Sequence, residues 1–318
     1  MAGTRGRKIG IVGAGLIGRA WAIVFARAGH EVAVFDGEPK AMAALGAALR
    51  AGLRALADAG LLAEAPEAVL ARVTPAASLA AASAEAFYVQ ESVAETLEAK
   101  RQIFAELDRR AAPDCILASS TSTIPGSLFS EGLDGRARII VAHPVNPPHL
   151  VPLVELVPTR YSDPDVVAKA KALLEEAGQV PIVVKGEIEG FILNRLQAAL
   201  VAEAFRLVDD GYVSCEDLDK TVKDGLGLRW SFMGPFETID LNAPGGVRDY
   251  VHRYAEAIQR LLRPQAEPYH WTSGLVDRIE AERRRLLPEA RLAERALWRD
   301  RRLAALLAHK REREKLGR

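Results

Sequence analysis

The sequence predicts an α/β domain with a mostly parallel sheet, followed by an all-α domain, with the boundary near residue 187. In residues 1–187, short β-branched runs alternate with alanine-rich segments, which is typical of βαβ units. From residue 188 to residue 318 such runs almost disappear, and apolar residues recur at helical spacing. This change of period divides the chain into two expected domains.

The elements of the first domain follow in order. KIGIVGAG is a predicted strand, LIGRAWAIVFARAG a helix and EVAVFDG a second strand. Residues 39–77 are rich in Ala and Leu, so a helix is predicted over that segment. Short proline-rich links join the last strands, so we expect an antiparallel addition at one edge of the sheet. The later strands are AFYVQES, CILASS, ARIIVAHPV, LVPLVELVP and VPIVVKG, with helices over 94–111 and 164–177.

The second domain begins with a long apolar-faced helix, LNRLQAALVAEAFRLVDDG. Gly211 is expected to end it, because glycine is the preferred residue just beyond a helix C-terminus. Ser214 fits the N-cap of the next helix, since its hydroxyl can accept a hydrogen bond from an amide of the first turn. From residue 277 onward, 14 basic and 8 acidic side chains make the tail more basic than the rest of the chain.

The composition excludes several classes of protein. With 42 Lys+Arg and 42 Asp+Glu the formal net charge is zero, whereas a general nucleic-acid binder needs a basic surplus. Cys115 and Cys215 are far apart and form no CxxC pattern, so neither a disulfide scaffold nor a metal site is expected. No run of 18 apolar residues occurs, so we expect no membrane partner and a cytoplasmic protein.

A glycine-rich turn predicts a dinucleotide site. The pattern GxGxxG occupies residues 13–18, directly after a predicted strand and before a predicted helix, and Asp36 ends the next strand. In such Rossmann-type units the helix N-terminus binds the pyrophosphate and the acid binds the adenosine ribose. A carboxylate at that position would repel a 2′-phosphate, so NAD is favoured over NADP. The expected cofactor-binding residues are Gly13, Gly15, Leu16, Ile17, Gly18 and Asp36.

Polar residues on two later strands predict the chemical site. Glu155 lies inside an otherwise apolar strand, where an unpaired carboxylate would be costly, and His143 ends the preceding strand. If these strands are antiparallel neighbours, Glu155 can bind one ring nitrogen of His143 and leave the other free as a general base. Two further polar segments are SSTST at 119–123 and GFILNR at 190–195, where Asn194 lies near the domain junction.

These segments resemble a known family. AHPVNPP, LVELVP, SSTSTIP and GFILNRL look like signature elements of the L-3-hydroxyacyl-CoA dehydrogenase superfamily, and the resemblance runs the whole length of the chain. DGLGLRWSFMGPFETIDLN and the WRD of the tail are similar to its short, non-CoA branch, the L-gulonate 3-dehydrogenases or lambda-crystallins. The resemblance implies an NAD-dependent oxidation of a 3-hydroxyl group.

The resemblance also implies a role for each matching residue. His143 would remove the hydroxyl proton while hydride leaves C3 for the nicotinamide, and Glu155 would stabilise the imidazolium. Ser122, Asn194, Glu95 and Lys100 complete the implied site, the first two holding the reacting oxygen and the last two lying near the nicotinamide ribose.

Two departures from the family bear on the substrate. Members that use CoA thioesters carry a serine and a lysine on the helix after the second strand, and Gly52 and Ala59 stand at those positions here. The chain also lacks the glycine- and tyrosine-rich ending of that branch. Both departures favour a small, free 3-hydroxy acid of the L-gulonate type. Arg229 is the candidate cation for its carboxylate, because guanidinium binds carboxylate in a bidentate manner.

Several alternatives stay open. A 3-hydroxyacyl-CoA dehydrogenase, for example one for 3-hydroxybutyryl-CoA, is the main one, and L-carnitine or a diketo ester are further substrates to consider. A non-catalytic, crystallin-like NAD-binding protein is an alternative of a different class. Arg229 could instead stack on Trp230 or pair with Asp224, and His149 is expected in an exposed loop. The resemblance finally implies a homodimer formed through the helical domain.

Overall fold

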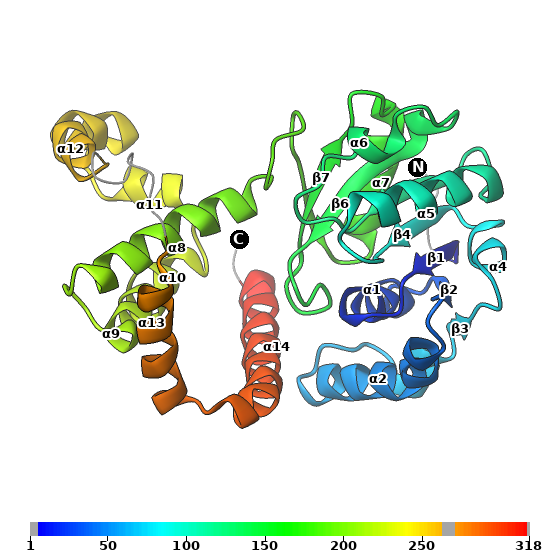
Figure 1. The fold of residues 1–318 in the computed structure, drawn as a ribbon, viewed down its shortest axis with the longest axis horizontal. Coiled ribbons are helices and arrows are strands. Elements are labelled where there is room, and N and C mark those ends of the chain that lie inside the picture. Colours follow the sequence, from blue (N-terminus) through cyan, green and yellow to red (C-terminus); the bar gives the residue numbers. More distant parts are fainter. Residues whose placement is uncertain (1–5, 263–270, 317–318) are drawn as a thin grey trace. The chain divides into compact units, whose positions relative to one another are not determined.

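The computed structural model describes residues 6–262 and 271–316. Its internal contacts divide the chain into two compact units, shown as a ribbon in Figure 1. The first unit comprises Met1–Asn194 and Ala296–Arg318, and the second comprises Arg195–Arg295. The last helix is therefore grouped with the first unit, whereas the sequence-based division placed every residue after 187 in one domain.

An eight-stranded sheet organises the first unit, with the strand order β3-β2-β1-β4-β5-β6-β7-β8. Neighbouring strands are parallel except for β6 and β7, so the predicted antiparallel step is confirmed at that pair. The outermost strand, β8, is parallel to β7 again. The strands are β1 (Lys8–Val12), β2 (Glu31–Phe35), β3 (Val73–Pro75), β4 (Tyr88–Glu91), β5 (Ile116–Ser119), β6 (Ile139–Pro144), β7 (Leu153–Pro158) and β8 (Val180–Val183).

Helices pack on both faces of this sheet and create two apolar cores. One core holds the aromatic side chains of α1 and the leucines of α2, together with residues of α7. The other holds Phe104 and Leu107 of α5 and Phe129 of α6. The helices are α1 (Leu16–Arg27), α2 (Pro39–Asp58), α3 (Pro66–Leu70), α4 (Leu79–Ser83), α5 (Leu97–Arg110), α6 (Ser127–Ser130) and α7 (Pro164–Glu176).

The helix predicted over 39–77 is confirmed in α2 and in the short α3, and it is wrong between and after them. Gly60 adopts a φ of +70°, which an L side chain rarely adopts, and the helix ends there. After the short α3, the chain extends into β3, whose Val73 pairs with Val32 of β2. Sheet pairing at an open edge outweighs the helix propensity of the flanking alanines.

The second unit is helical, as predicted. Gly211 follows the first helix, and amides just after that helix donate back to its last carbonyls, from Gly211 to Val208 and from Tyr212 to Leu207. The hydroxyl of Ser214 accepts from the amide of Asp217, so the predicted N-cap is confirmed. The helices are α8 (Leu193–Asp209), α9 (Cys215–Lys220), a π-helical turn (Thr221–Leu226), α10 (Gly227–Trp230), α11 (Pro235–Leu241), α12 (Gly246–Leu262) and α13 (Ser273–Leu286).

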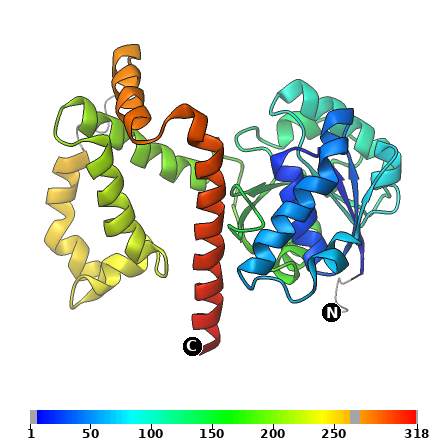
Figure 2. The same cartoon turned by 90° about the horizontal axis from the view of Figure 1, so that it is seen from below.

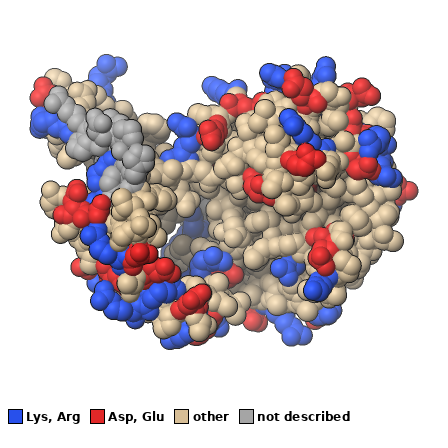
Figure 3. Space-filling view, viewed as in Figure 1, with Lys and Arg blue, Asp and Glu red and all other residues tan. Residues whose placement is uncertain are grey.

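The final helix, α14 (Leu292–Leu316), returns to the first unit and is continuous in Figure 2. Ala304 is buried, and Leu303, Leu307 and Ala308 pack against the core that holds α1 and α2. Basic and acidic side chains are interspersed over the face shown in Figure 3. No helix within the described ranges has the length and apolar character that crossing a lipid bilayer requires.

Candidate active site

The glycine-rich turn joins β1 to α1 in a conformation that other residues would disrupt. Gly13 has a φ of +102°, and a Cβ there would overlap the carbonyl oxygen of Ser92. A Cβ on Gly18 would overlap the carbonyl oxygen of Gly13, so the helix can approach the turn only without one. At Gly15 the space is open, with no heavy atom within 4 Å of a Cβ built there.

This turn has the features that a dinucleotide requires. Gly15 is the N-cap of α1 and supplies no side-chain acceptor, so the amides of Leu16 and Ile17 face the open space uncapped. Asp36 lies beside them, because its Oδ2 accepts from the amide of Ala14 at 2.6 Å. The open space, the uncapped helix end and the adjacent carboxylate together fit the pyrophosphate and ribose of NAD.

The expected pairing of His143 and Glu155 is present. The two residues lie directly opposite each other in the antiparallel β6–β7 pair, on the same face of the sheet. Nδ1 of His143 lies 2.8 Å from Oε2 of Glu155, and both side chains are buried. The carboxylate therefore fixes the ring orientation and leaves Nε2 as the ring nitrogen that does not bind it.

The second oxygen of Glu155 binds the chain just before and at the start of α8. Oε1 accepts from the amides of Ile192 at 2.8 Å and Leu193 at 3.0 Å. Burial alone would raise the pKa of Glu155, but the hydrogen bonds from His143 and these amides outweigh it and hold that pKa below 4.5. Glu155 is thus an anion, and both of its carboxylate oxygens accept hydrogen bonds.

Phe191 completes this part of the site, and the sequence analysis did not single it out. It is fully buried, its φ is +49°, and its ring centroid lies 5.4 Å from that of His143. A bulky residue in the left-handed region is uncommon and indicates local strain. The position of Phe191 inside the GFILNR segment, next to the amides that bind Glu155, was the available signal.

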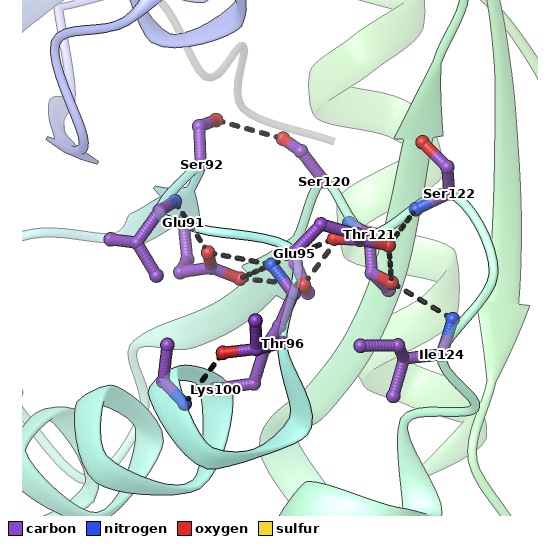
Figure 4. A network of polar contacts seen from close by, with 12 residues as sticks. Glu91, Ser92, Glu95, Thr96, Lys100, Ser120, Thr121, Ser122 and Ile124 are labelled. Atoms are coloured by element: carbon purple, nitrogen blue, oxygen red, sulfur yellow. Dashed lines mark hydrogen bonds and ion pairs between the residues drawn. The ribbon is translucent and has the colours of Figure 1, made fainter.

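Ser122 and Asn194 are in hydrogen-bond contact within the first unit. Nδ2 of Asn194 donates to the carbonyl oxygen of Ser122 at 2.8 Å, and the amide of Ser122 donates to Glu95 at 2.7 Å. Ser122 does not cap the next helix, since α6 begins only after its N-cap, Gly126. Its hydroxyl points away from the network drawn in Figure 4 and stays available for a ligand.

Comparison with known proteins identifies the family. Residues 8–188 match the model of the 3-hydroxyacyl-CoA dehydrogenase NAD binding domain, and residues 190–285 match the C-terminal domain of the same enzymes. The chain belongs to the 3-hydroxyacyl-CoA dehydrogenase family. As a member it is an NAD-dependent oxidoreductase that acts on a CH–OH group.

Individual relatives cover nearly the whole chain. Lambda-crystallin of Oryctolagus cuniculus is 40% identical over 307 residues, which is 95% of this chain and 96% of that protein. L-carnitine dehydrogenase of a Pseudomonas species is 35% identical over 93% of this chain and 91% of its own length. The solved structure of 5-formyl-3-hydroxy-2-methylpyridine 4-carboxylic acid 5-dehydrogenase is 27% identical, with a TM-score of 0.79 over 95% and 97% of the two chains.

In this dehydrogenase Glu95 and Lys100 belong to one polar network, shown in Figure 4. The ammonium group of Lys100 lies between carboxylates, 2.9 Å from Oε1 of Glu91 and 3.2 Å from Oε2 of Glu95. Their contact with the nicotinamide ribose stays a prediction. Glu91 was missed by the sequence analysis, although an acid at the end of a buried strand was the signal.

Two other residues considered in the sequence analysis, Arg229 and His149, take no part in this polar network. Arg229 is exposed on α10 of the second unit, and Asp224 pairs with Lys223 at 3.1 Å. His149 lies in a turn, as expected, but the expectation that its side chain is exposed is wrong, because the side chain is largely enclosed. Burial and then the charge of Arg27 lower the pKa of His149 to about 4, so it is neutral near pH 7.

Proposed function

We propose that this dehydrogenase oxidises the 3-hydroxyl of a small, free 3-hydroxy acid of the L-gulonate type to the 3-keto acid. The buried His143–Glu155 pair carries the proposal. It provides a ring nitrogen held for proton transfer, and the backbone of Ser122 and the side chain of Asn194 are bonded to each other in the same unit. Such a carboxylate-oriented histidine is the arrangement that a general base needs.

Each residue has a separate task in this mechanism. Nε2 of His143 takes the proton of the substrate C3 hydroxyl, and the anionic Glu155 stabilises the imidazolium that forms. The hydroxyl of Ser122 and the amide of Asn194 donate hydrogen bonds to the same oxygen as it becomes a carbonyl. Bound NAD supplies the acceptor for the hydride that leaves C3.

The α1–α2 contact supports a free acid over a CoA ester. Gly52, where the family resemblance implies a serine for CoA, faces α1, and a Cβ there would lie 2.6 Å from Cδ1 of Ile23. A serine would have to displace that side chain, so this part of α2 is built for helix packing. Ala59, where the resemblance implies a lysine, offers no cation for a phosphate.

A substrate panel tests the proposal. We expect the purified enzyme to form NADH from NAD with L-gulonate, to act more slowly on L-carnitine and 3-hydroxybutyrate, and to leave acetoacetyl-CoA unreduced with NADH. Turnover of the CoA ester alone would establish the acyl-CoA alternative. NAD binding without turnover of any compound would establish a non-catalytic role.

The same panel tests Arg229 as the carboxylate ligand. Arg229→Met is expected to raise the KM for the acid at least tenfold, because a bidentate ion pair is lost, while kcat changes little. Lys223→Met, which removes an exposed cation of the same unit, is the matched control. An unchanged KM in Arg229→Met would remove this residue from the substrate site.

We further propose that the enzyme is a homodimer, with the second unit as the interface. Cys215, Thr238, Ala243 and Leu275 are the buried residues among the described part of that unit, and neither α8 nor α12 contributes one. Val251 and Tyr254 of α12, one helical turn apart, are 50% and 44% exposed. A helical unit with so small a core gains stability by covering such apolar stripes with a second copy.

Light scattering after size exclusion tests the homodimer. At micromolar concentration the wild type is expected at twice the mass of one chain, and Val251→Asp with Tyr254→Asp at the mass of one chain with a lower Tm, because two charges would be buried at the contact. His252→Asp, an exposed neighbour off the apolar stripe, should stay dimeric. A monomeric wild type would contradict the proposal.

A further inference from the structure

Glu91 and Lys100 form a buried ion pair to which the proposed mechanism assigns no step. Glu91 ends β4 and is 0% exposed, and Lys100 of α5 is 1% exposed. The ammonium group contacts both carboxylate oxygens of Glu91, at 2.9 and 3.2 Å. Removing two charges from water is energetically costly before their attraction is counted. A pair this deeply buried therefore calls for a role beyond stability.

The other partners of Glu91 hold it in a single orientation. Its Oε2 accepts from the hydroxyl of Ser119 at 2.6 Å, and its Oε1 accepts from the amide of Val93 at 2.7 Å. Ser119 ends β5 and Val93 follows β4, so the carboxylate connects the ends of two neighbouring strands. Glu91 thereby presents Lys100 at a fixed position.

Lys100 in turn holds the carboxylate of Glu95 in place. Its ammonium lies 3.2 Å from Oε2 of Glu95, and the other oxygen of Glu95 faces the segment after β5. That oxygen accepts from the hydroxyl of Thr121 at 2.6 Å and from the amides of Ser122 at 2.7 Å and Thr123 at 3.3 Å. Figure 4 shows the resulting chain of contacts from Glu91 through the lysine to Ser122.

The backbone of Ser122 is consequently held at two points. Its amide is bound by Glu95, and its carbonyl oxygen is bound by Asn194. The direction of the Ser122 hydroxyl then depends on where Glu95 stands. We propose that Glu91 and Lys100 are positioning residues, which act through Glu95 to set the Ser122 hydroxyl against the reacting oxygen. This inference rests on the proposed function of Ser122.

The charges agree with this geometry. Burial, which opposes ionisation, is outweighed at Glu95 by the hydroxyl of Thr121, the charge of Lys100 and the amide of Ser122, so the pKa of Glu95 lies below 4.5. Glu95 is therefore an anion, and an anion is the stronger acceptor for the loop amides. Without the ammonium, the carboxylates of Glu91 and Glu95 would lack the cation that they share.

A double-variant experiment separates positioning from stability. Glu91→Gln and Lys100→Met are each expected to lower Tm, since the first leaves the buried Lys100 with only the carboxylate of Glu95 and the second leaves the buried carboxylate of Glu91 without its cation. The double variant, in which the introduced amide oxygen can still accept from Ser119, is expected to regain most of that loss. Its kcat should nevertheless stay about 10- to 100-fold below wild type with KM little changed, because the hydroxyl of Ser122 remains misplaced.

The contrary result is equally clear. A double variant that regains kcat together with Tm would show a structural role only and would overturn the inference. Glu98→Gln, on the exposed side of α5, is the control and should match wild type in both quantities. If the buried variants do not fold, Glu95→Gln at the half-exposed end of the chain of contacts replaces them, with the same expected fall in kcat; an unchanged kcat would overturn the inference.

An NMR readout without substrate keeps this inference distinct from the proposed function. In the wild type the amide protons of Ser122 and Thr123, which bind the carboxylate of Glu95, are expected to shift as that carboxylate titrates. Lys100→Met, alone or with Glu91→Gln, is expected to raise the pH of that titration, because the cation that lowers the pKa of Glu95 is gone. The indole N–H of Trp21, bonded to Ser120, is the internal reference.

Unmoved amide titrations would overturn the inference even if the substrate panel succeeds. Conversely, a panel without turnover would refute the proposed function while the NMR titration still decides whether Lys100 acts on the Ser122 loop.

Discussion

His143→Gln is expected to lower kcat about a thousandfold, because the amide cannot accept the substrate proton. Glutamine retains a donor for Oε2 of Glu155, so the buried carboxylate keeps a partner and the fold is preserved. The affinity for NAD should stay at the wild-type value, since the glycine-rich turn lies on a different pair of elements. Steady-state kinetics and a separate NAD titration measure the two quantities.

The matched control is His149→Gln. His149 is already neutral near pH 7, and its structural contact is made by the backbone carbonyl, which accepts from Arg27. Its kcat should therefore match wild type. If His143→Gln kept more than a tenth of the wild-type kcat, or if His149→Gln lost as much, the base would have to be sought elsewhere.

Glu155→Gln is expected to reduce kcat by a similar factor for a different reason. Glu155 accepts on both sides, from His143 on one and from the amides of Ile192 and Leu193 on the other. A glutamine has an NH2 group in place of one carboxylate oxygen. That group must face either the amides of Ile192 and Leu193, which are themselves donors, or Nδ1 of His143. The second choice selects the tautomer with its proton on Nε2, which cannot act as the base.

The pH dependence of stability checks the same substitution. The pKa of Glu155 is held below 4.5 in the folded protein, so its carboxylate contributes stability that is complete above the unfolded-state pKa and lost as pH falls through the folded-state pKa. Denaturant unfolding should show a stability gap between wild type and Glu155→Gln at pH 7 that narrows below about pH 4.5. A gap that stays constant with pH would contradict an anionic Glu155.

The dinucleotide turn and the His–Glu pair were predictable because both follow from local rules. A glycine pattern between a strand and a helix specifies a turn that only glycine fits, and an acid inside an apolar strand requires a partner. His143 ends the preceding strand, and strand pairing placed it opposite Glu155. In both cases the contacting residues lie on one element or on two elements that follow each other in the chain, so the sequence pattern is enough to predict the contact.

Other features depend on contacts between distant segments. Helix propensity predicted residues 71–77 as helical, but pairing with β2 makes part of them a strand. Phe191 contacts His143 only in the folded unit, and Glu91 acquires its partners only when β5 and α5 bring Ser119 and Lys100 to it. No periodicity or motif within a single segment predicts these contacts between distant segments.

By itself the sequence predicted the alternation of strands and helices, the nucleotide turn, the pairing of His143 with Glu155, and the change to helices after the sheet. The tertiary structure decided that Glu155 also binds the start of α8, that Lys100 serves two carboxylates and that α14 packs on the first unit. The reason is physical. Periodicity records which face of an element is buried, whereas the partner of a buried polar group is set by how elements far apart in the chain pack together.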